Sequence, residues 1–123
     1  MSSKTASSSL YLINSAIQLM KMKIFEVSTI DFLEDKRLIN NALSDMASQF
    51  NMPNDFTFGE PTSRFGWTFF KLWVRPNLQN AINDKFGDMI RRYKGNPDEK
   101  FTFFIADYFQ SKGCKTKIKL IEI

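Results

Sequence analysis

The chain has 123 residues, a net charge of +4 at pH 7, a single cysteine and no histidine. Histidine is the commonest catalytic base and thiolates are frequent zinc ligands, so this composition argues against most enzymes and metal sites. Aromatic residues make up 15% of the chain, which suits one small domain with a large core and a binding role, and the mild positive charge favours an acidic partner.

Residues 1–22 differ from the rest of the chain because they are rich in serine and contain no acidic residue. A secretory signal needs an unbroken apolar stretch, which Asn14 and Gln18 interrupt, and an organellar transit peptide is usually rich in arginine. Residues 12–20 have helical spacing of apolar side chains. We expect an N-terminal appendage, either a short helix or a targeting segment. The expected location is cytoplasmic, or organellar if this segment is a transit peptide.

The following residues predict a strand and then a helix. Residues 23–27 are apolar and β-branched, which indicates a strand. Ser28 followed three residues later by Asp31 resembles a capping box, so a helix is expected to begin there and to end near Asn51, before Pro53. Apolar residues recur on one face of this helix: Phe32, Ile39, Leu43, Met46 and Phe50.

Two strands and a second helix are expected in the middle of the chain. Residues 56–58 and 67–74 have the composition of strands, and residues 59–63 between them are typical of a turn. Strand 67–74 is bulky on both faces, which favours a central strand covered on both sides. A helix is expected from Asn77 to Tyr93, where apolar residues follow one face at helical spacing.

Residues 100–109 and 115–123 predict two more strands, joined by a hairpin turn at residues 111–113. The element order is then strand, helix, strand, strand, helix, strand, strand. This order is that of the α+β, ferredoxin-like split βαβ plan with one extra C-terminal strand. We therefore expect residues 23–123 to form a single domain, with a sheet of about five strands and two helices on one face. No apolar run reaches the ~18 residues of a transmembrane helix.

Strand 67–74 combines aromatic and basic residues, as do sheet surfaces that bind single-stranded nucleic acid. By the period of two in a strand, Trp67, Phe69 and Trp73 share a face with Lys71, and three lysines share a face of the last strand. We predict single-stranded RNA or DNA as the partner. The residues expected to contact it are Arg64, Trp67, Phe69, Lys71, Trp73, Arg91, Arg92, Lys115, Lys117 and Lys119. The alternative is that the aromatics belong to the core and the lysines protect an edge strand from aggregation.

Assembly with an acidic protein surface is the second hypothesis. The 13 Phe, 3 Tyr and 2 Trp are more than a small core is expected to hide, and aromatic residues outside a core are typical of interface hot spots. Trp73, Tyr108 and Phe109 lie near the ends of predicted strands, where exposure is expected. A last strand ending at Ile123 also suits pairing with a partner's sheet edge, as in an inhibitor or a structural subunit.

The acidic residues show no spacing that indicates a shared catalytic site. Asp107 shares a face of the predicted strand 100–109 with apolar residues, so it could be a buried catalytic acid. The alternative is a surface residue, which is either exposed to solvent or paired with a lysine across the hairpin. Cys114 has no neighbouring base, and the glycines form no phosphate-binding loop. We therefore predict no catalytic residues, no metal and no cofactor.

Overall fold

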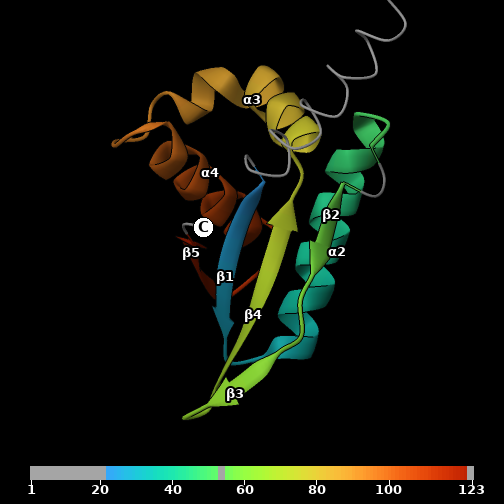
Figure 1. The fold of residues 1–123 in the computed structure, drawn as a ribbon, viewed down its shortest axis with the longest axis vertical. Helices are drawn as coiled ribbons and strands as arrows, with labels where there is room; N and C mark the ends of the chain where they lie inside the picture. The colour runs from blue at the N-terminus through green and yellow to red at the C-terminus, as the bar shows by residue number, and fades with distance from the viewer. Residues whose placement is uncertain (1–21, 53–54, 122–123) are drawn as a thin grey trace, which may run out of the picture.

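A computed structural model describes residues 22–52 and 55–121. The predicted N-terminal appendage, residues 1–22, lies outside the described residues except for Met22, as do residues 122–123 of the predicted last strand. The described chain is an α+β arrangement of five strands and three helices (Figure 1). Within these ranges, no helix is both long enough and apolar enough to cross a membrane.

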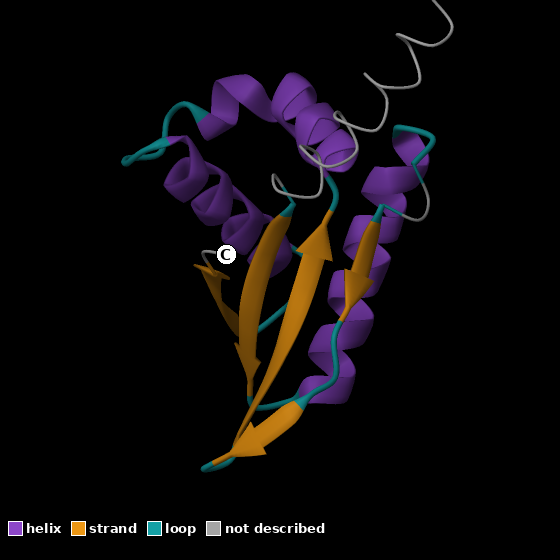
Figure 2. Cartoon of the chain, viewed as in Figure 1, coloured by secondary structure: helices purple, strands orange, loops and turns teal. Residues whose placement is uncertain are grey.

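The strands form one antiparallel sheet, drawn in orange in Figure 2. They are β1 (Lys23–Thr29), β2 (Phe56–Phe58), β3 (Thr62–Arg64), β4 (Trp67–Val74) and β5 (Thr116–Ile121). Their order is β2-β4-β1-β5, and β3 pairs with the first residues of β4. The predicted strands 56–58 and 67–74 are confirmed at their predicted bounds, and the predicted strand 23–27 extends to Thr29.

The helices are α2 (Phe32–Gln49), α3 (Pro76–Ile90) and α4 (Pro97–Ser111). Their apolar residues form one core with alternate residues of the strands. The ring of Phe25 in β1 stacks on Phe101 of α4 at 6.2 Å, and Phe70 of β4 meets Phe32 of α2 edge to face at 5.2 Å. Leu78 of α3 is fully buried in the same core. Each fully buried phenylalanine contributes about 2–3 kcal/mol, so this face of the sheet supplies much of the stability.

Helix α4 occupies residues for which a strand was predicted at 100–109 and a hairpin at 111–113, and both predictions are wrong. Asn96 Oδ1 accepts the Glu99 N–H at 2.9 Å, and Glu99 Oε1 accepts the Asn96 N–H at 3.1 Å, which completes a capping box. The residues that the helix buries are Phe101, Phe104, Ile105 and Phe109. Their spacing of three and four places them on one helical face.

Helix α2 begins at Phe32 rather than at Ser28, because β1 continues to Thr29. The Thr29 hydroxyl donates to Asp35 Oδ2 at 2.5 Å, and the Lys115 N–H donates to Asp35 Oδ1 at 3.2 Å. Asp35 is buried although it is acidic. Its carboxylate therefore ties the first turn of α2 to β1 and to the chain just before β5.

A two-residue turn joins β3 to β4, and because β3 begins at Thr62 the predicted turn over residues 59–63 is wrong for Thr62 and Ser63. Phe65 and Gly66 form this turn with φ angles of 53° and 81°. Two successive positive φ values are the pattern of a type I′ hairpin turn, which matches the twist of the flanking strands. The hairpin extends from one end of the sheet, beside the label β3 in Figure 1.

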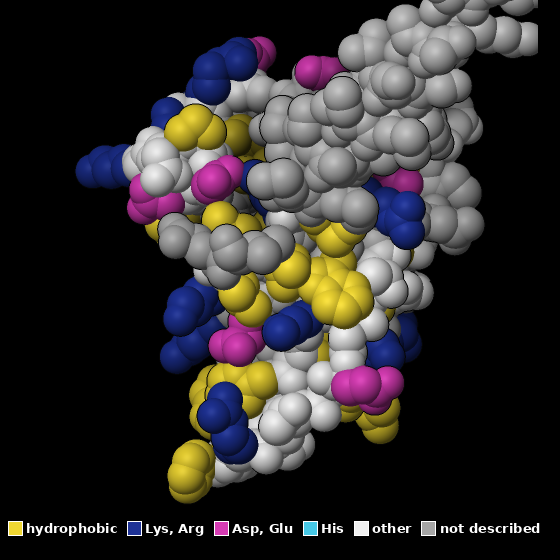
Figure 3. Space-filling view, viewed as in Figure 1, with side chains coloured by type: hydrophobic (Ala, Val, Ile, Leu, Met, Phe, Trp, Pro, Cys, Tyr) yellow, Lys and Arg dark blue, Asp and Glu magenta, His cyan; other side chains and the backbone are white. Residues whose placement is uncertain are grey.

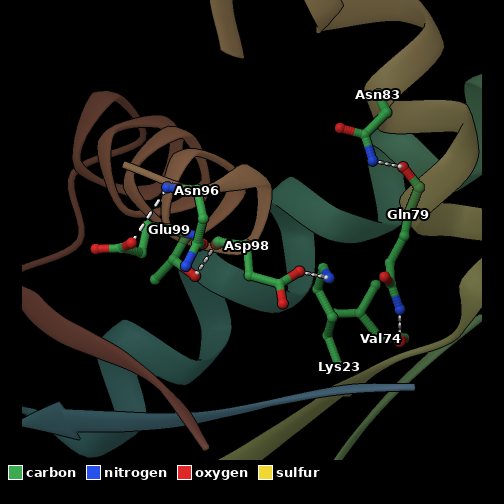
Figure 4. A network of polar contacts seen from close by, with 8 residues as sticks. Lys23, Val74, Gln79, Asn83, Asn96, Asp98 and Glu99 are labelled. Carbon is green, nitrogen blue, oxygen red and sulfur yellow. Dashed lines mark hydrogen bonds and ion pairs between the residues drawn. The ribbon is translucent and has the colours of Figure 1, made fainter. Parts of the chain in front are cut away.

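Figure 4 shows how α3 and α4 are attached to the opposite end of the sheet. Lys23 Nζ of β1 and Asp98 Oδ1 of α4 form an ion pair at 2.6 Å. Gln79 Nε2 of α3 donates to the carbonyl of Val74, the last residue of β4, at 2.8 Å, and Asn83 Nδ2 donates to the Gln79 carbonyl at 3.0 Å. Because Lys23 and Val74 are partners in the β1–β4 register, these bonds fix both helices at the same end.

Candidate functional site

The outer face of the sheet is the face turned away from the three described helices. Side chains alternate along a strand, so the residues between the buried Phe70, Leu72 and Val74 of β4 point away from the helices. The outer face carries Ile24, Glu26 and Ser28 of β1, Trp67, Phe69, Lys71 and Trp73 of β4, and Lys117, Lys119 and Ile121 of β5. Apolar side chains and cations lie side by side over the strands in Figure 3. The described helices cover one side of β4 only, so the prediction of a strand covered on both sides is not met among the described residues.

The strand register places the predicted contact residues of two separate strands next to one another. Glu26 of β1 lies between Lys71 of β4 and Lys119 of β5, and in the next row Phe69 and Lys117 flank one residue of β1. Side chains directly opposite in antiparallel strands have Cβ atoms about 4.5–5.5 Å apart. Both sets therefore lie within reach of one bound partner.

Two cations lie over aromatic rings on this face. The guanidinium carbon of Arg64, on β3, is 4.8 Å from the centre of the Phe69 ring, and Lys117 Nζ is 5.4 Å from the centre of the Trp67 ring. Both distances are within the ~6 Å limit for a cation–π contact. Stacking surfaces and positive charges are therefore interleaved on the outer face rather than separated into two patches.

A groove of about 410 Å³ opens beside the break between β2 and β3. Its lining residues are Glu26, Gly59, Glu60, Thr62, Arg64, Phe69, Phe70, Lys71 and Trp73. The Gly59 N–H donates to the Lys71 carbonyl at 2.8 Å. A Cβ atom at Gly59 would lie 3.3 Å from the Lys71 Cβ, so glycine lets this segment approach β4 closely and shape the groove wall.

Three of the predicted contact residues lie outside the strands that form the outer face. Arg91 and Arg92 follow the last residue of α3, in the helical layer, and Arg92 lines a separate groove of about 190 Å³ with Tyr93. Lys115 precedes β5, and its backbone N–H is held by Asp35. Seven of the ten predicted contact residues therefore lie on strands of the outer face, and Arg91 and Arg92 lie in the helical layer.

Phe65, at the tip of the β3–β4 hairpin, was not predicted as a site residue. Its side chain is 101% exposed, and its φ of 53° is unusual for a bulky residue. An aromatic side chain that buries nothing within the described chain gains no packing energy there. The signal in the sequence is the pair Phe65-Gly66 directly before an alternating strand, a two-residue hairpin loop of the X-Gly type.

The remaining candidate groups for catalysis are explained by local contacts. Asp107 is exposed on α4 and accepts a hydrogen bond from the Tyr93 hydroxyl at 2.5 Å, so the alternative of a buried acid is wrong. This hydrogen bond raises the pKa of Tyr93.

Burial, with the charge of Asp35 as the next cause, raises the pKa of the Cys114 thiol to about 11, so the thiol is protonated at neutral pH. In the part of the chain that the structure describes, no group of three or more His, Cys, Asp or Glu residues could hold a metal ion.

No protein-family model matches the chain, and searches of curated proteins and of solved structures likewise return no match. Function is therefore inferred from the residues of the outer face and their geometry.

Proposed function

We propose that the outer face binds single-stranded RNA or DNA and that the protein is a non-enzymatic binding module. The observation that carries this proposal is the position of the described helices, all of which pack on the other face. They leave Trp67, Phe69 and Trp73 on the outer face, with cations over Trp67 and Phe69. Aromatic side chains that stack on bases contribute about 1–3 kcal/mol per base and accept any base. Small domains that stack two or three bases on a four-stranded sheet use the same principle.

The charges of the outer face suit a phosphate backbone. Arg64, Lys71, Lys117 and Lys119 are all exposed and supply four positive charges, against one negative charge from Glu26. Each phosphate contact releases counterions, so affinity for a single strand falls with a slope of about 0.7 in log–log form per contact. A strand following this face would therefore show both base stacking and a measurable dependence on salt.

We also propose that the domain follows the ferredoxin-like split βαβ plan. The strand order β2-β4-β1-β5 and the two crossovers, β1-α2-β2 and β4-α3-α4-β5, support this assignment. In this proposal α4 is an additional helix within the second crossover, where the sequence predicted a strand. The plan places both crossovers on one face and leaves the other face for a ligand.

The experiment is a titration with a mixed-sequence single-stranded RNA of about ten nucleotides, followed by tryptophan fluorescence between about 50 and 200 mM salt. We expect quenching that persists at the higher salt. The double variant Lys117→Gln with Lys119→Gln should lower the salt slope by about 1.4, from two lost contacts at about 0.7 each.

The matched control removes the same number of charges from the helical layer, through Arg91→Gln with Arg92→Gln. This variant should keep the wild-type salt slope, because both residues lie away from the outer face. Equal slopes for the two double variants, or no quenching of the wild-type protein, would contradict the proposal.

The edge position of β5 favours a second candidate, which is assembly with another protein. Among the described strands β5 pairs only with β1, so its other edge has backbone groups available for a partner strand. The simplest case is pairing with a second copy of this chain. Analytical ultracentrifugation tests it, since a monomer at every concentration contradicts self-pairing through β5.

A further inference from the structure

Glu26 is an exception on the outer face, because it is the single carboxylate among the outer-face residues of β1, β4 and β5. Lys71 and Lys119 are its cross-strand neighbours, yet no ion pair or hydrogen bond joins Glu26 to any described residue. A carboxylate repels phosphates, so on a surface that bound only the backbone of a strand it would lower affinity. A carboxylate in this place is useful if it contacts a group that donates hydrogen bonds.

Trp73, which lines the same groove, has an unused donor. Its indole nitrogen is buried and has no hydrogen-bond partner among the described residues, and both Trp73 and Glu26 line the groove. Buried donors in native proteins are nearly always paired, with protein, water or ligand. The groove therefore combines two carboxylates, Glu26 and Glu60, with one donor, and the described chain itself leaves these groups unpaired.

The groove also has the size and the walls of a base-binding site. Its volume of about 410 Å³ is within the range of ~300–1,000 Å³ that is common for small-ligand sites. Phe69 and Trp73 supply aromatic walls, and Arg64 and Lys71 lie on the lining where a phosphate attached to the bound nucleoside could be neutralised. These features fit a single nucleotide of a longer strand.

We infer that this groove selects guanine within the bound strand, an inference that rests on the proposed function. An ionised carboxylate is an acceptor with two oxygens, and guanine alone among the common bases presents two adjacent N–H donors, N1–H and the 2-amino group, on its Watson–Crick edge. The carbonyl O6 beside them accepts a hydrogen bond, which the Trp73 indole N–H would supply after a turn of the side chain brings its buried nitrogen into the groove. Adenine, cytosine and uracil each offer a single donor group on this edge, next to one or two acceptors.

The test compares labelled single strands in a fluorescence-anisotropy titration: a uridine decamer, the same decamer with one central guanosine, and the same with one central inosine. Inosine keeps N1–H and O6 but lacks the 2-amino group. The wild-type protein should bind the guanosine strand at least about fivefold more tightly than the uridine strand, with inosine between them.

Two variants of Glu26 separate its charge from its geometry. Glu26→Gln keeps the shape but replaces one acceptor by a donor, so the preference for guanosine should disappear while affinity for the uridine strand rises. Glu26→Asp keeps the charge but withdraws the oxygens, so the preference should shrink without that rise. Circular dichroism on each variant checks that the fold is retained.

Glu60→Gln is the matched control, because it removes the same charge from the lining of the same groove. It should raise affinity for every strand and keep the preference for guanosine. Loss of the preference in Glu26→Gln but not in Glu60→Gln supports the inference. Binding of all strands with no preference in the wild type, or a preference that survives in Glu26→Gln, overturns it and leaves the proposed function standing. Failure to bind any strand overturns the proposed function and this inference together.

Discussion

The two faces of β4 have different roles although they share one backbone. On the helical side, alternate residues such as Phe70 and Leu72 are buried in an apolar core with residues of all three described helices. On the outer side, aromatic residues of similar size, such as Phe69, lie beside Lys71 and under Arg64. Aromatic content alone does not distinguish a core from a binding surface. Burial does, since Phe70 is buried among other rings and Phe69 is half-buried on a face that no described helix covers. Cations lie over rings on both faces, such as Phe101 in the core and Phe69 outside it.

The largest expected effects, on the free energy of unfolding and on RNA binding, come from truncating one aromatic ring on each face of β4. Phe70→Ala should lower the free energy of unfolding by about 3–5 kcal/mol, because it leaves a cavity in the core. Phe69→Ala should lower it by less than about 1 kcal/mol but weaken binding of single-stranded RNA by about 1–3 kcal/mol. Urea unfolding and an RNA titration measure the two quantities. If both variants are destabilised equally, Phe69 is a core residue and the two faces of β4 do not differ as described.

A smaller difference in stability is expected between two carboxylates, Asp35 on the helical side of the sheet and Glu26 on its outer face. Asp35→Ala should destabilise the protein by about 2 kcal/mol, because the buried Thr29 hydroxyl and the Lys115 N–H lose their acceptor. Glu26→Gln should change the free energy of unfolding by less than about 0.5 kcal/mol, since no described residue pairs with Glu26. Thermal unfolding of both variants tests the contrast, which would be lost if Glu26→Gln were the more damaging change.

The smallest effect is expected at the hairpin tip, where an aromatic ring buries nothing. Phe65→Asn should raise the free energy of unfolding by about 0.5–1 kcal/mol, because asparagine adopts positive φ more readily than phenylalanine in an X-Gly turn. Chemical denaturation of the two proteins measures this difference. A clear loss of stability would mean that Phe65 packs within the chain, contrary to its full exposure.

Period-two and helical patterns were sufficient to predict the strand 67–74 and the helix beginning near residue 77, since both are long and strongly periodic. They failed at residues 100–109, where Phe101, Phe103 and Ile105 alternate as in a strand while the wider spacing is helical. The sequence did contain the deciding signal, which is the capping box of Asn96 and Glu99. Local hydrogen bonding at the helix start outweighed the alternation of three residues.

The candidate site was predictable only in part, for a physical reason. Alternation along one strand places Trp67, Phe69 and Lys71 on a common face, and this holds in the structure. The side of the sheet that the helices cover, and the register that brings Lys119 next to Glu26, depend on tertiary packing that no local pattern encodes. The same limit explains why Arg91 was grouped with these residues although it lies in the helical layer.

The most direct test of the outer-face account uses the two tryptophans of the chain, Trp67 and Trp73, which both lie on this face. Their two indole N–H groups should give two separate signals in a nitrogen–proton correlation spectrum. On addition of mixed-sequence single-stranded RNA at physiological salt, the account predicts that both indole signals shift while the backbone signals of α2 stay in place. Unchanged indole signals, or shifts confined to the residues around Arg91 and Arg92, would contradict it.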